Sequence, residues 1–239
     1  IIEIQGTQYT DVFPTAYLNG STTAISGKDY LKTEDGQVIV NADGYPKINP
    51  TKSVLIGNRE PDFQMGLNNT FYFKGLNFAF LIDGRKGGDI YNATSRGMWS
   101  SGQHKDLEFY RGRQVVWAGV VQQPDGSYIK NTTPIVLDSK TITEYYSGVS
   151  SNFIEDGSYI RLNYLTIGYD FLSLLKKKTQ FTSLKCSLTA SNLLLLTKYT
   201  GSDPQINANT GSGGTGGMGI DSYPVPPTRG INLSVLATF

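Results

Sequence analysis

The chain has 239 residues, including 27 Gly and 10 Pro, and charged side chains make up only 17% of it, against roughly 25% in soluble globular domains. The 21 Lys and Arg residues nearly balance the 20 Asp and Glu residues, so the sequence has no basic footprint for nucleic acid and no acidic tail. The one cysteine, Cys186, has no internal disulfide partner, and the one histidine, His104, cannot supply a multi-histidine metal site. Disulfide-rich scaffolds and zinc enzymes are therefore excluded.

The longest apolar runs, at 115–121 and 193–196, are far shorter than a membrane-spanning helix requires, which excludes a helical membrane protein. The chain opens on Ile1 without an initiator Met or a signal segment, so we expect further residues before it. With 15 Tyr and 11 Phe beside abundant Gly, Ser, Thr and Asn, the composition predicts an all-β protein.

Five segments have the period-2 pattern of a strand with two unlike faces. In the first, 63–73, every second residue from the start is apolar except Asn69. The Lys74-Gly75 pair predicts a tight turn, after which the strand 76–84 completes a hairpin.

The third strand, 159–171, changes phase along its length. Its apolar residues lie on one face up to Leu162 and continue on the other from Leu165. This change predicts a β-bulge near Asn163-Tyr164.

The fourth and fifth strands, 181–192 and 231–239, alternate cleanly. Ten residues of strand tilted by about 45° cover roughly 25 Å, which is the height of the apolar band on an outer-membrane barrel. Each of the five segments is about that long.

The connections alternate between short and long. Lys74-Gly75 and 172–180 are short, whereas 85–157 and 193–228 are long and rich in Gly, Ser and Pro. Bacterial β-barrels combine short periplasmic turns with long extracellular loops in this way. With Lys74-Gly75 in the periplasm, the strand count also places Phe239 there.

A soluble β-sandwich or adhesin is the alternative, because its strands alternate too. Two features count against it: the unequal connections, and the small core that five strands with such long loops can bury. Five strands are also too few to close a membrane barrel, which needs about eight. We therefore expect most of the barrel to lie upstream of Ile1.

Several stretches carry a family pattern: 87–92, 153–162, 167–169, 191–193, 197–204, 220–224 and 229–239. In these stretches the chain resembles the C-terminal part of SusC/RagA-like TonB-dependent outer-membrane transporters of Bacteroidetes. The match covers 60–92 and 153–239, is loose over 31–58, and is absent over 93–150, which we interpret as a long loop. The chain departs from the family pattern at Ser202, Gln205 and Asp170-Phe171.

The resemblance implies that residues 1–239 are the C-terminal part of a 22-stranded transmembrane barrel, with 85–157 and 193–228 as long extracellular loops. It implies TonB-dependent import of an oligosaccharide, or in some members an oligopeptide, with a SusD-like surface lipoprotein as partner. The plug and the TonB-contacting segment are expected outside this chain. Transporter and lipoprotein pairs are expected to form a dimer, integral to the outer membrane. A passive porin or adhesin-type barrel is the alternative of another class.

Candidate contact residues for substrate or partner are Trp99, Tyr110 and Trp117, because flat aromatic faces stack on sugar rings or pack against proteins. The alternative is that they pack the loop on itself or join an interfacial aromatic girdle. The final strand resembles the signal captured by the outer-membrane assembly machinery, through Ile231, Leu233, Val235, Ala237 and Phe239. Polar residues expected to face the lumen are Gln64, Asn68, Asn77, Asp83, Lys185 and Ser187.

No enzyme, metal site or cofactor is predicted. The glycine-rich stretch 214–219 satisfies the dinucleotide fingerprint but lacks the strand before it and the helix after it. His104 lies in a mixed-charge segment and is interpreted as a solvated loop residue. A hydrolase would need an acid/base set that this segment lacks. Turns are predicted at the Asp-Gly pairs 35–36, 43–44, 83–84, 125–126 and 156–157.

Overall fold

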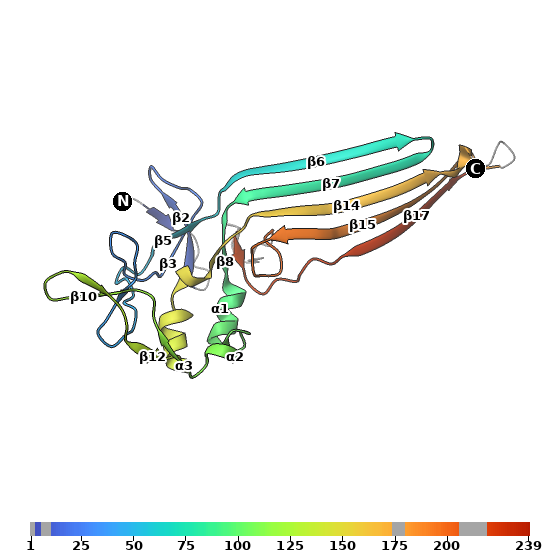
Figure 1. Cartoon of the computed structure of the whole chain (residues 1–239). Coiled ribbons are helices and arrows are strands. Elements are labelled where there is room, and N and C mark those ends of the chain that lie inside the picture. The colour runs from blue at the N-terminus through green and yellow to red at the C-terminus, as the bar shows by residue number, and fades with distance from the viewer. Residues whose placement is uncertain (1–2, 6–10, 174–179, 206–218) are drawn as a thin grey trace. The chain divides into compact units, whose positions relative to one another are not determined.

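The computed structural model describes residues 3–5, 11–173, 180–205 and 219–239, and it divides the chain into two compact units (Figure 1). Each unit collects three stretches that are distant in sequence. Most of the predicted connection at 172–180 lies outside the described residues, as do residues 214–218 of the glycine-rich stretch. The first unit consists of Ile1–Glu60, Gly88–Asp156 and Gln205–Pro224, and the second of Pro61–Gly87, Gly157–Pro204 and Val225–Phe239.

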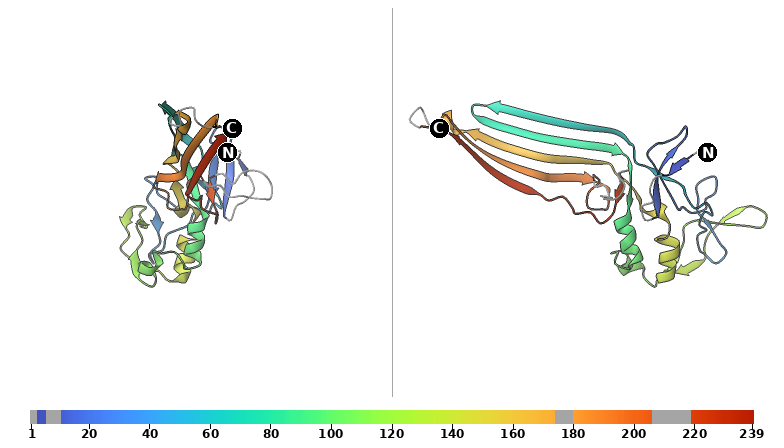
Figure 2. Two further views of the ribbon diagram at one scale, coloured as in Figure 1. Left: turned by 90° about the vertical axis from the view of Figure 1, so that its right-hand side faces the viewer. Right: turned by 180° about the vertical axis from the view of Figure 1, so that it is seen from behind.

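The second unit is one antiparallel sheet with the strand order β17, β15, β14, β7, β6. Its strands run side by side in Figure 1 and again in Figure 2. They correspond to the five predicted strands, which are confirmed. Their bounds are Pro61–Phe73 for β6, Leu76–Gly87 for β7, Tyr159–Asp170 for β14, Ser183–Thr197 for β15 and Gly230–Thr238 for β17.

The predicted hairpin turn is confirmed. Phe73 pairs with Leu76, and the two residues between them, Lys74 and Gly75, have φ values of 48° and 88°. Positive φ at both central positions is the geometry of the turn that fits the twist of a two-residue hairpin.

The predicted bulge is confirmed as well. The register of β14 shifts between Leu162 and Tyr164 against both of its neighbours, so Asn163 is the extra residue. On β15 the matching irregularity lies at Asn192, which has a φ of 53°. After the bulge, Leu165 lies on the same face as Leu162, and one apolar face continues along the whole strand.

Two strands run further than predicted. β7 continues to Gly87 and β15 to Thr197, so the long connections begin later than residues 85 and 193. The irregularity at Asn192 explains the second difference, because it lets β15 keep pairing with β14 through Leu194 and Leu196.

The first unit is built from short strands and helical turns. Its sheets contain β1 (Glu3–Gln5), β2 (Val12–Tyr17), β3 (Ala24–Gly27) and β5 (Val54–Asn58); β11 (Tyr128–Lys130), β10 (Val120–Gln122) and β4 (Ile39–Val40); β12 (Pro134–Val136) and β9 (Gln114–Val116); and β13 (Ile154–Asp156), β8 (Asp89–Asn92) and β16 (Ile220–Asp221). Its helices are α1 (Ala93–Ser100), α2 (Leu107–Tyr110) and α3 (Ser139–Thr141), with a π-helical turn at Ile142–Tyr146 and a 3₁₀ turn at Ser150–Phe153. The second unit adds a 3₁₀ turn at Phe171–Ser173.

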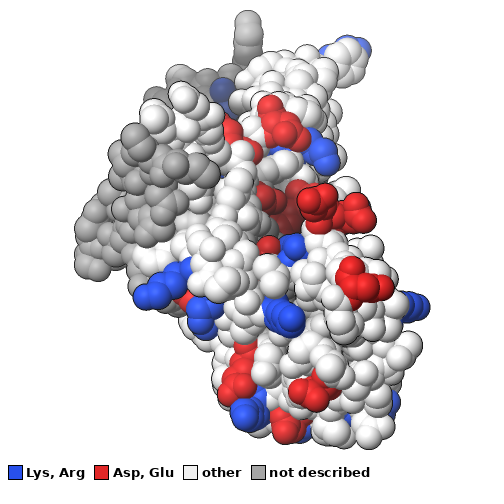
Figure 3. Space-filling view, turned by 90° about the vertical axis from the view of Figure 1, so that its left-hand side faces the viewer, with Lys and Arg blue, Asp and Glu red and all other residues white. Residues whose placement is uncertain are grey.

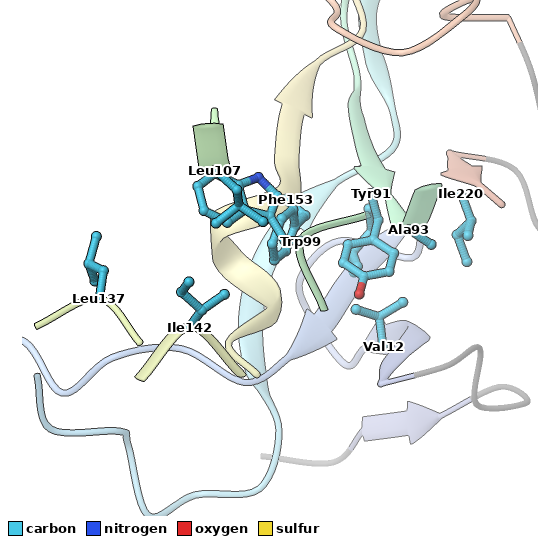
Figure 4. Packing of buried hydrophobic residues seen from close by; sticks show 10 residues of the cluster. Val12, Tyr91, Ala93, Trp99, Leu107, Leu137, Ile142, Phe153 and Ile220 are labelled. Atoms are coloured by element: carbon cyan, nitrogen blue, oxygen red, sulfur yellow. The ribbon is translucent and has the colours of Figure 1, made fainter. Parts of the chain in front are cut away.

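A hydrophobic core holds the first unit together. Residues from distant stretches meet in it, among them Val12, Tyr91, Phe153 and Ile220 (Figure 4). The region 93–150, interpreted from the sequence as a long loop, thus folds into helices and strands around this core. Helix α1 begins there because the Asn92 side chain accepts a hydrogen bond from Ser95 N at 2.8 Å.

One predicted turn is wrong. Asp83-Gly84 lies inside β7, where Asp83 pairs with Arg161 of β14. The Asp-Gly pairs 35–36, 43–44 and 125–126 do form turns, with positive φ at each glycine. At Asp83 the neighbouring strand supplies hydrogen-bond donors that outweigh the local turn preference.

Candidate functional site

The five-stranded sheet has one apolar face. Register places Phe71, Phe78, Ile167, Leu188 and Leu233 in a single row across all five strands. About half of the Phe71, Ile167 and Leu188 side chains is exposed, and 70% of Leu233. An apolar surface this continuous indicates contact with a membrane or a partner.

The opposite face is polar. The adjacent row consists of Thr70, Ala79, Thr166, Thr189 and Asn232, and the two central hydroxyls are 2.8 Å apart. Register also places on this face all of the residues that the sequence assigned to the lumen, namely Gln64, Asn68, Asn77, Asp83, Lys185 and Ser187.

A polar network occupies this face near the Tyr159 end of β14. The Tyr159 hydroxyl donates to Asp83 Oδ2 at 3.0 Å, and the Asn163 amide donates to the other carboxylate oxygen. The guanidinium groups of Arg85 and Arg161 lie 5.6 and 5.5 Å from the Tyr159 ring centroid. The negative face of the ring thus stabilises two cations that would otherwise repel each other.

The same two guanidinium groups hold the segment that follows β15. Arg161 Nη2 donates to Asp203 Oδ1 at 2.6 Å, and both side chains are almost completely buried. Arg85 donates to the carbonyl oxygens of Gly157 and Pro204, at 2.8 and 3.0 Å through its Nη2. This pair of contacts fixes residues 203–204 against the polar face of the sheet.

The sequence analysis assigned no role to Arg85, Arg161 or Asp203. A usable signal was present, since Arg85 and Arg161 both fall on the polar side of their strands. The pairing with Asp203 could not be predicted, because 42 residues separate the two partners.

The structure separates the three aromatic residues predicted to contact substrate or partner. Trp99 is only 8% exposed and lies in the core of the first unit, with Phe153 and Leu107 nearby in Figure 4. Its burial argues against a contact role, because no ligand reaches a core residue. Trp117 is half-buried against that core, and only Tyr110 is exposed, at 38%.

His104 is not the solvated residue that the sequence indicated. Its ring stacks on Trp99, with centroids 4.8 Å apart, and 14% of its side chain is exposed. Trp99 also contacts Tyr146, whose pKa burial raises above its usual value. The indole therefore organises an aromatic cluster inside the first unit.

Asp11 joins four stretches of the first unit. Its carboxylate accepts hydrogen bonds from the Tyr91 hydroxyl and from Ser150 Oγ, the latter at 2.7 Å. It also lies 3.2 Å from Arg96 Nε on α1. These contacts position β8 and α1 against the segment that leads into β2.

The C-terminal strand β17 lies at one edge of the sheet, paired with β15. Four of the predicted assembly-signal residues, from Ile231 to Ala237, share the apolar face with Leu188 of β15. Phe239 follows the strand, is 78% exposed, and contacts the Phe181 ring at 4.8 Å.

The surface charge of the chain is mixed. On the face shown in Figure 3, acidic and basic side chains are interspersed among neutral ones. Within the described residues, no group of three or more His, Cys, Asp or Glu side chains is arranged to hold a metal ion. None of the described helices has both the length and the apolar character needed to cross a membrane.

Comparison with known proteins decides the family. The chain is 26% identical over 234 residues to TonB-dependent receptor P3 of Formosa agariphila, covering 96% of the chain and 21% of the receptor. It is 22% identical over 198 residues to TonB-dependent receptor SusC of Bacteroides thetaiotaomicron, covering 79% of the chain and 16% of SusC. The chain matches the C-terminal part of the SusC/RagA-like family.

The fold is shared with a solved SusC/RagA-like structure. Against the RagAB peptide transporter the TM-score is 0.56 at 15% identity, covering 99% of this chain and 28% of the other. No family model matches the chain. The chain spans about a fifth of the length of the curated SusC/RagA-like receptors it matches. The family resemblance predicted from the sequence is confirmed.

Proposed function

We propose that this chain is part of the wall of a transmembrane β-barrel in the bacterial outer membrane, with the apolar face of its sheet against lipid. The observation that carries the proposal is the pair of adjacent rows, one apolar from Phe71 to Leu233 and one polar or small from Thr70 to Asn232. Lipid-facing and lumen-facing residues alternate in this way along barrel strands. Strands of nine to fifteen residues, tilted by about 45°, are long enough to cross an apolar band of about 25 Å.

The polar face lines the lumen or contacts the plug. The network around Asp83 and Tyr159 and the row through Thr166 and Thr189 offer hydrogen bonds there. The two outer strands of the sheet, β6 and β17, pair with strands from outside this chain, which completes a barrel of 22 strands. Closure in this way removes unpaired sheet edges.

The orientation follows from the hairpin. With Lys74-Gly75 in the periplasm, Phe239 lies there too, and the connections 85–157 and 193–228 are extracellular. Short periplasmic turns and long extracellular loops are usual in such barrels.

The whole protein, we infer, imports an oligomeric nutrient, energised by TonB through a region outside this chain and served by a SusD-like surface lipoprotein. Sequence similarity to proteins described as TonB-dependent receptors supports the inference. An oligosaccharide is the proposed substrate. An oligopeptide is the second candidate, because the similar RagAB structures are described as a peptide importer. The proposal assigns no covalent chemistry to this chain.

The first test is purification of the full-length protein from outer membranes in mild detergent. We expect a polypeptide several times larger than the 26.2 kDa of these residues, together with a co-purifying lipoprotein. A 26.2 kDa polypeptide in the soluble fraction, with no partner, would overturn the proposal.

The second test separates the two substrate classes. A strain that lacks the gene is compared with its parent on a panel of oligosaccharides and on a panel of oligopeptides as limiting nutrients. We expect slower growth on at least one oligosaccharide, restored by the gene but not in a strain without TonB. A defect confined to oligopeptides would replace the substrate class and keep the importer.

A further inference from the structure

A small pocket lies within the second unit, beside the part of β15 that extends beyond β17. It measures about 150 Å³. Its floor is the buried Arg161–Asp203 ion pair, and its rim includes Ser202 and the exposed Arg229. Leu195 and Pro227 supply apolar walls. At about 30 Å³ per water molecule, the space suits a group of only a few heavy atoms.

The charges around the pocket favour an anion. Of its ionisable lining residues, Arg161 and Arg229 are cationic and only Asp203 is anionic, which leaves one positive charge in excess. Asp203 accepts through Oδ1 from Arg161 Nη2. The buried Nε of the same guanidinium has no hydrogen-bond partner among the described residues.

An unsatisfied buried donor destabilises the fold, and an oxyanion seated beside a guanidinium relieves that cost. The planar fork of Arg matches the two oxygens of a carboxylate. The walls formed by Leu195 and Pro227 fit the carbon chain that carries such a group.

We propose that this pocket binds the carboxylate group of a small ligand, with Arg229 and Arg161 as the cationic side of the site and Ser202 as a hydroxyl donor at its rim. The carboxylate can come from a peptide terminus or from an acidic sugar. The inference goes beyond import, since binding to the solubilised protein does not require transport.

The test is calorimetric titration of the full-length protein in detergent. Peptide-type probes are N-acetylglycine and its neutral amide, and sugar-type probes are methyl glucuronide and neutral methyl glucoside. Inorganic phosphate is the competing anion. We expect the acid of at least one pair to bind, and its neutral counterpart to bind roughly tenfold or more weakly, the loss expected for a charge-assisted hydrogen bond. Which acid binds more tightly identifies the source of the carboxylate.

Two variants and a control make the assignment specific. Arg229→Gln removes the rim cation, and Ser202→Phe fills the pocket from an exposed position; we expect each to weaken binding of the acid by about tenfold or more. Lys198→Gln removes an exposed cation that does not line the pocket, so it should leave binding unchanged. The proposal is overturned if neither acid binds, if acid and neutral probe bind equally, if phosphate binds more tightly than both acids, or if Ser202→Phe binds like the parent protein.

Discussion

At the scale of single residues, the buried Arg161–Asp203 pair stands out. Charges taken out of water are costly unless they are paired and hydrogen-bonded, and here the partner comes from the segment after β15. The two guanidinium groups beside Tyr159 differ in this respect. Arg85 donates to backbone carbonyl oxygens, whereas Arg161 depends on one carboxylate.

We expect Asp203→Ala to destabilise the second unit by about 3–5 kcal/mol, because it leaves the Arg161 guanidinium buried without its counter-charge. Urea unfolding of the full-length protein in detergent measures the effect. Glu34→Ala, at an exposed position, is the control and should change the stability by less than about 0.5 kcal/mol. Equal stability of the two variants would contradict the role assigned to the pair.

Asp29 gives the first unit a pH dependence. Burial alone would raise the pKa of its carboxyl group, but hydrogen bonds from Lys32 and Ser151, at 2.6 and 2.7 Å, outweigh burial and lower the pKa below its usual value. The folded-state pKa is thus depressed. The charged form stabilises the unit above the ordinary Asp pKa of about 3.9, and this contribution is lost as the pH falls through the folded-state pKa.

We therefore expect Asp29→Asn to speed backbone hydrogen exchange over residues 28–32 at pH 7, and the difference from the parent to shrink below about pH 3.5. Mass spectrometry of the deuterated protein measures both. Asp35→Asn, in an exposed turn, serves as the control. A difference that stays constant with pH would show that the charge of Asp29 is not involved.

At the scale of elements, the β6–β7 hairpin depends on backbone conformations at its turn. Lys74 and Gly75 both have positive φ, and a β-branched residue resists that conformation. The bulge at Asn163 acts on β14 in a comparable way, since one extra residue keeps the apolar face continuous.

Replacement of the turn glycine tests the first point. We expect Gly75→Val to destabilise the hairpin by roughly 1–2 kcal/mol and to lower the folded yield in lipid vesicles. Gly66→Val is the matched control, because Gly66 lies inside β6 without positive φ and has open space around its Cβ position. Similar yields for both variants would rule out turn strain as the cause.

The C-terminal strand carries a second prediction at this scale. Removal of Phe239 is expected to reduce assembly into the outer membrane, because capture of the terminal strand uses alternate side chains as anchors. Heat-modifiable mobility of the outer-membrane fraction measures folded yield. Phe181→Ala controls for loss of the ring contact alone. Unchanged yield after removal would exclude Phe239 from the assembly signal.

At the scale of the whole molecule, the two units follow different physical rules. In the second unit the apolar residues point outward on one face of the sheet, and Leu233 is 70% exposed. In the first unit they point inward, and residues such as Val12, Tyr91 and Ile220 are almost completely buried. The second arrangement is that of a water-soluble core, the first that of a sheet solvated by lipid.

Neighbouring residues of β17 distinguish the two faces. We expect Leu233→Arg to destabilise the assembled protein by about 2–4 kcal/mol, because the cation would lie within the apolar band. Asn232→Arg, one residue away on the polar face, should have little effect. Unfolding in lipid vesicles compares them. Equal losses would mean that the apolar face of the sheet does not contact lipid.

The five strands, the turn at Lys74-Gly75 and the bulge near Asn163 could be predicted from residue order. Alternation of side chains along a strand is a local property with a period of two residues, so a pattern of ten residues is enough to reveal it. The same pattern, with the family stretches, predicted the SusC/RagA-like resemblance that the comparisons confirm.

The core around Trp99, the pairing of Arg161 with Asp203 and the strand position of Asp83 emerged only from the tertiary fold. Each depends on residues brought together from distant parts of the chain, and such contacts leave no periodic trace in the sequence. Trp99 illustrates the difference: an aromatic ring in an irregular segment suits a binding surface and a core equally well, and burial by neighbours from other segments decides between them.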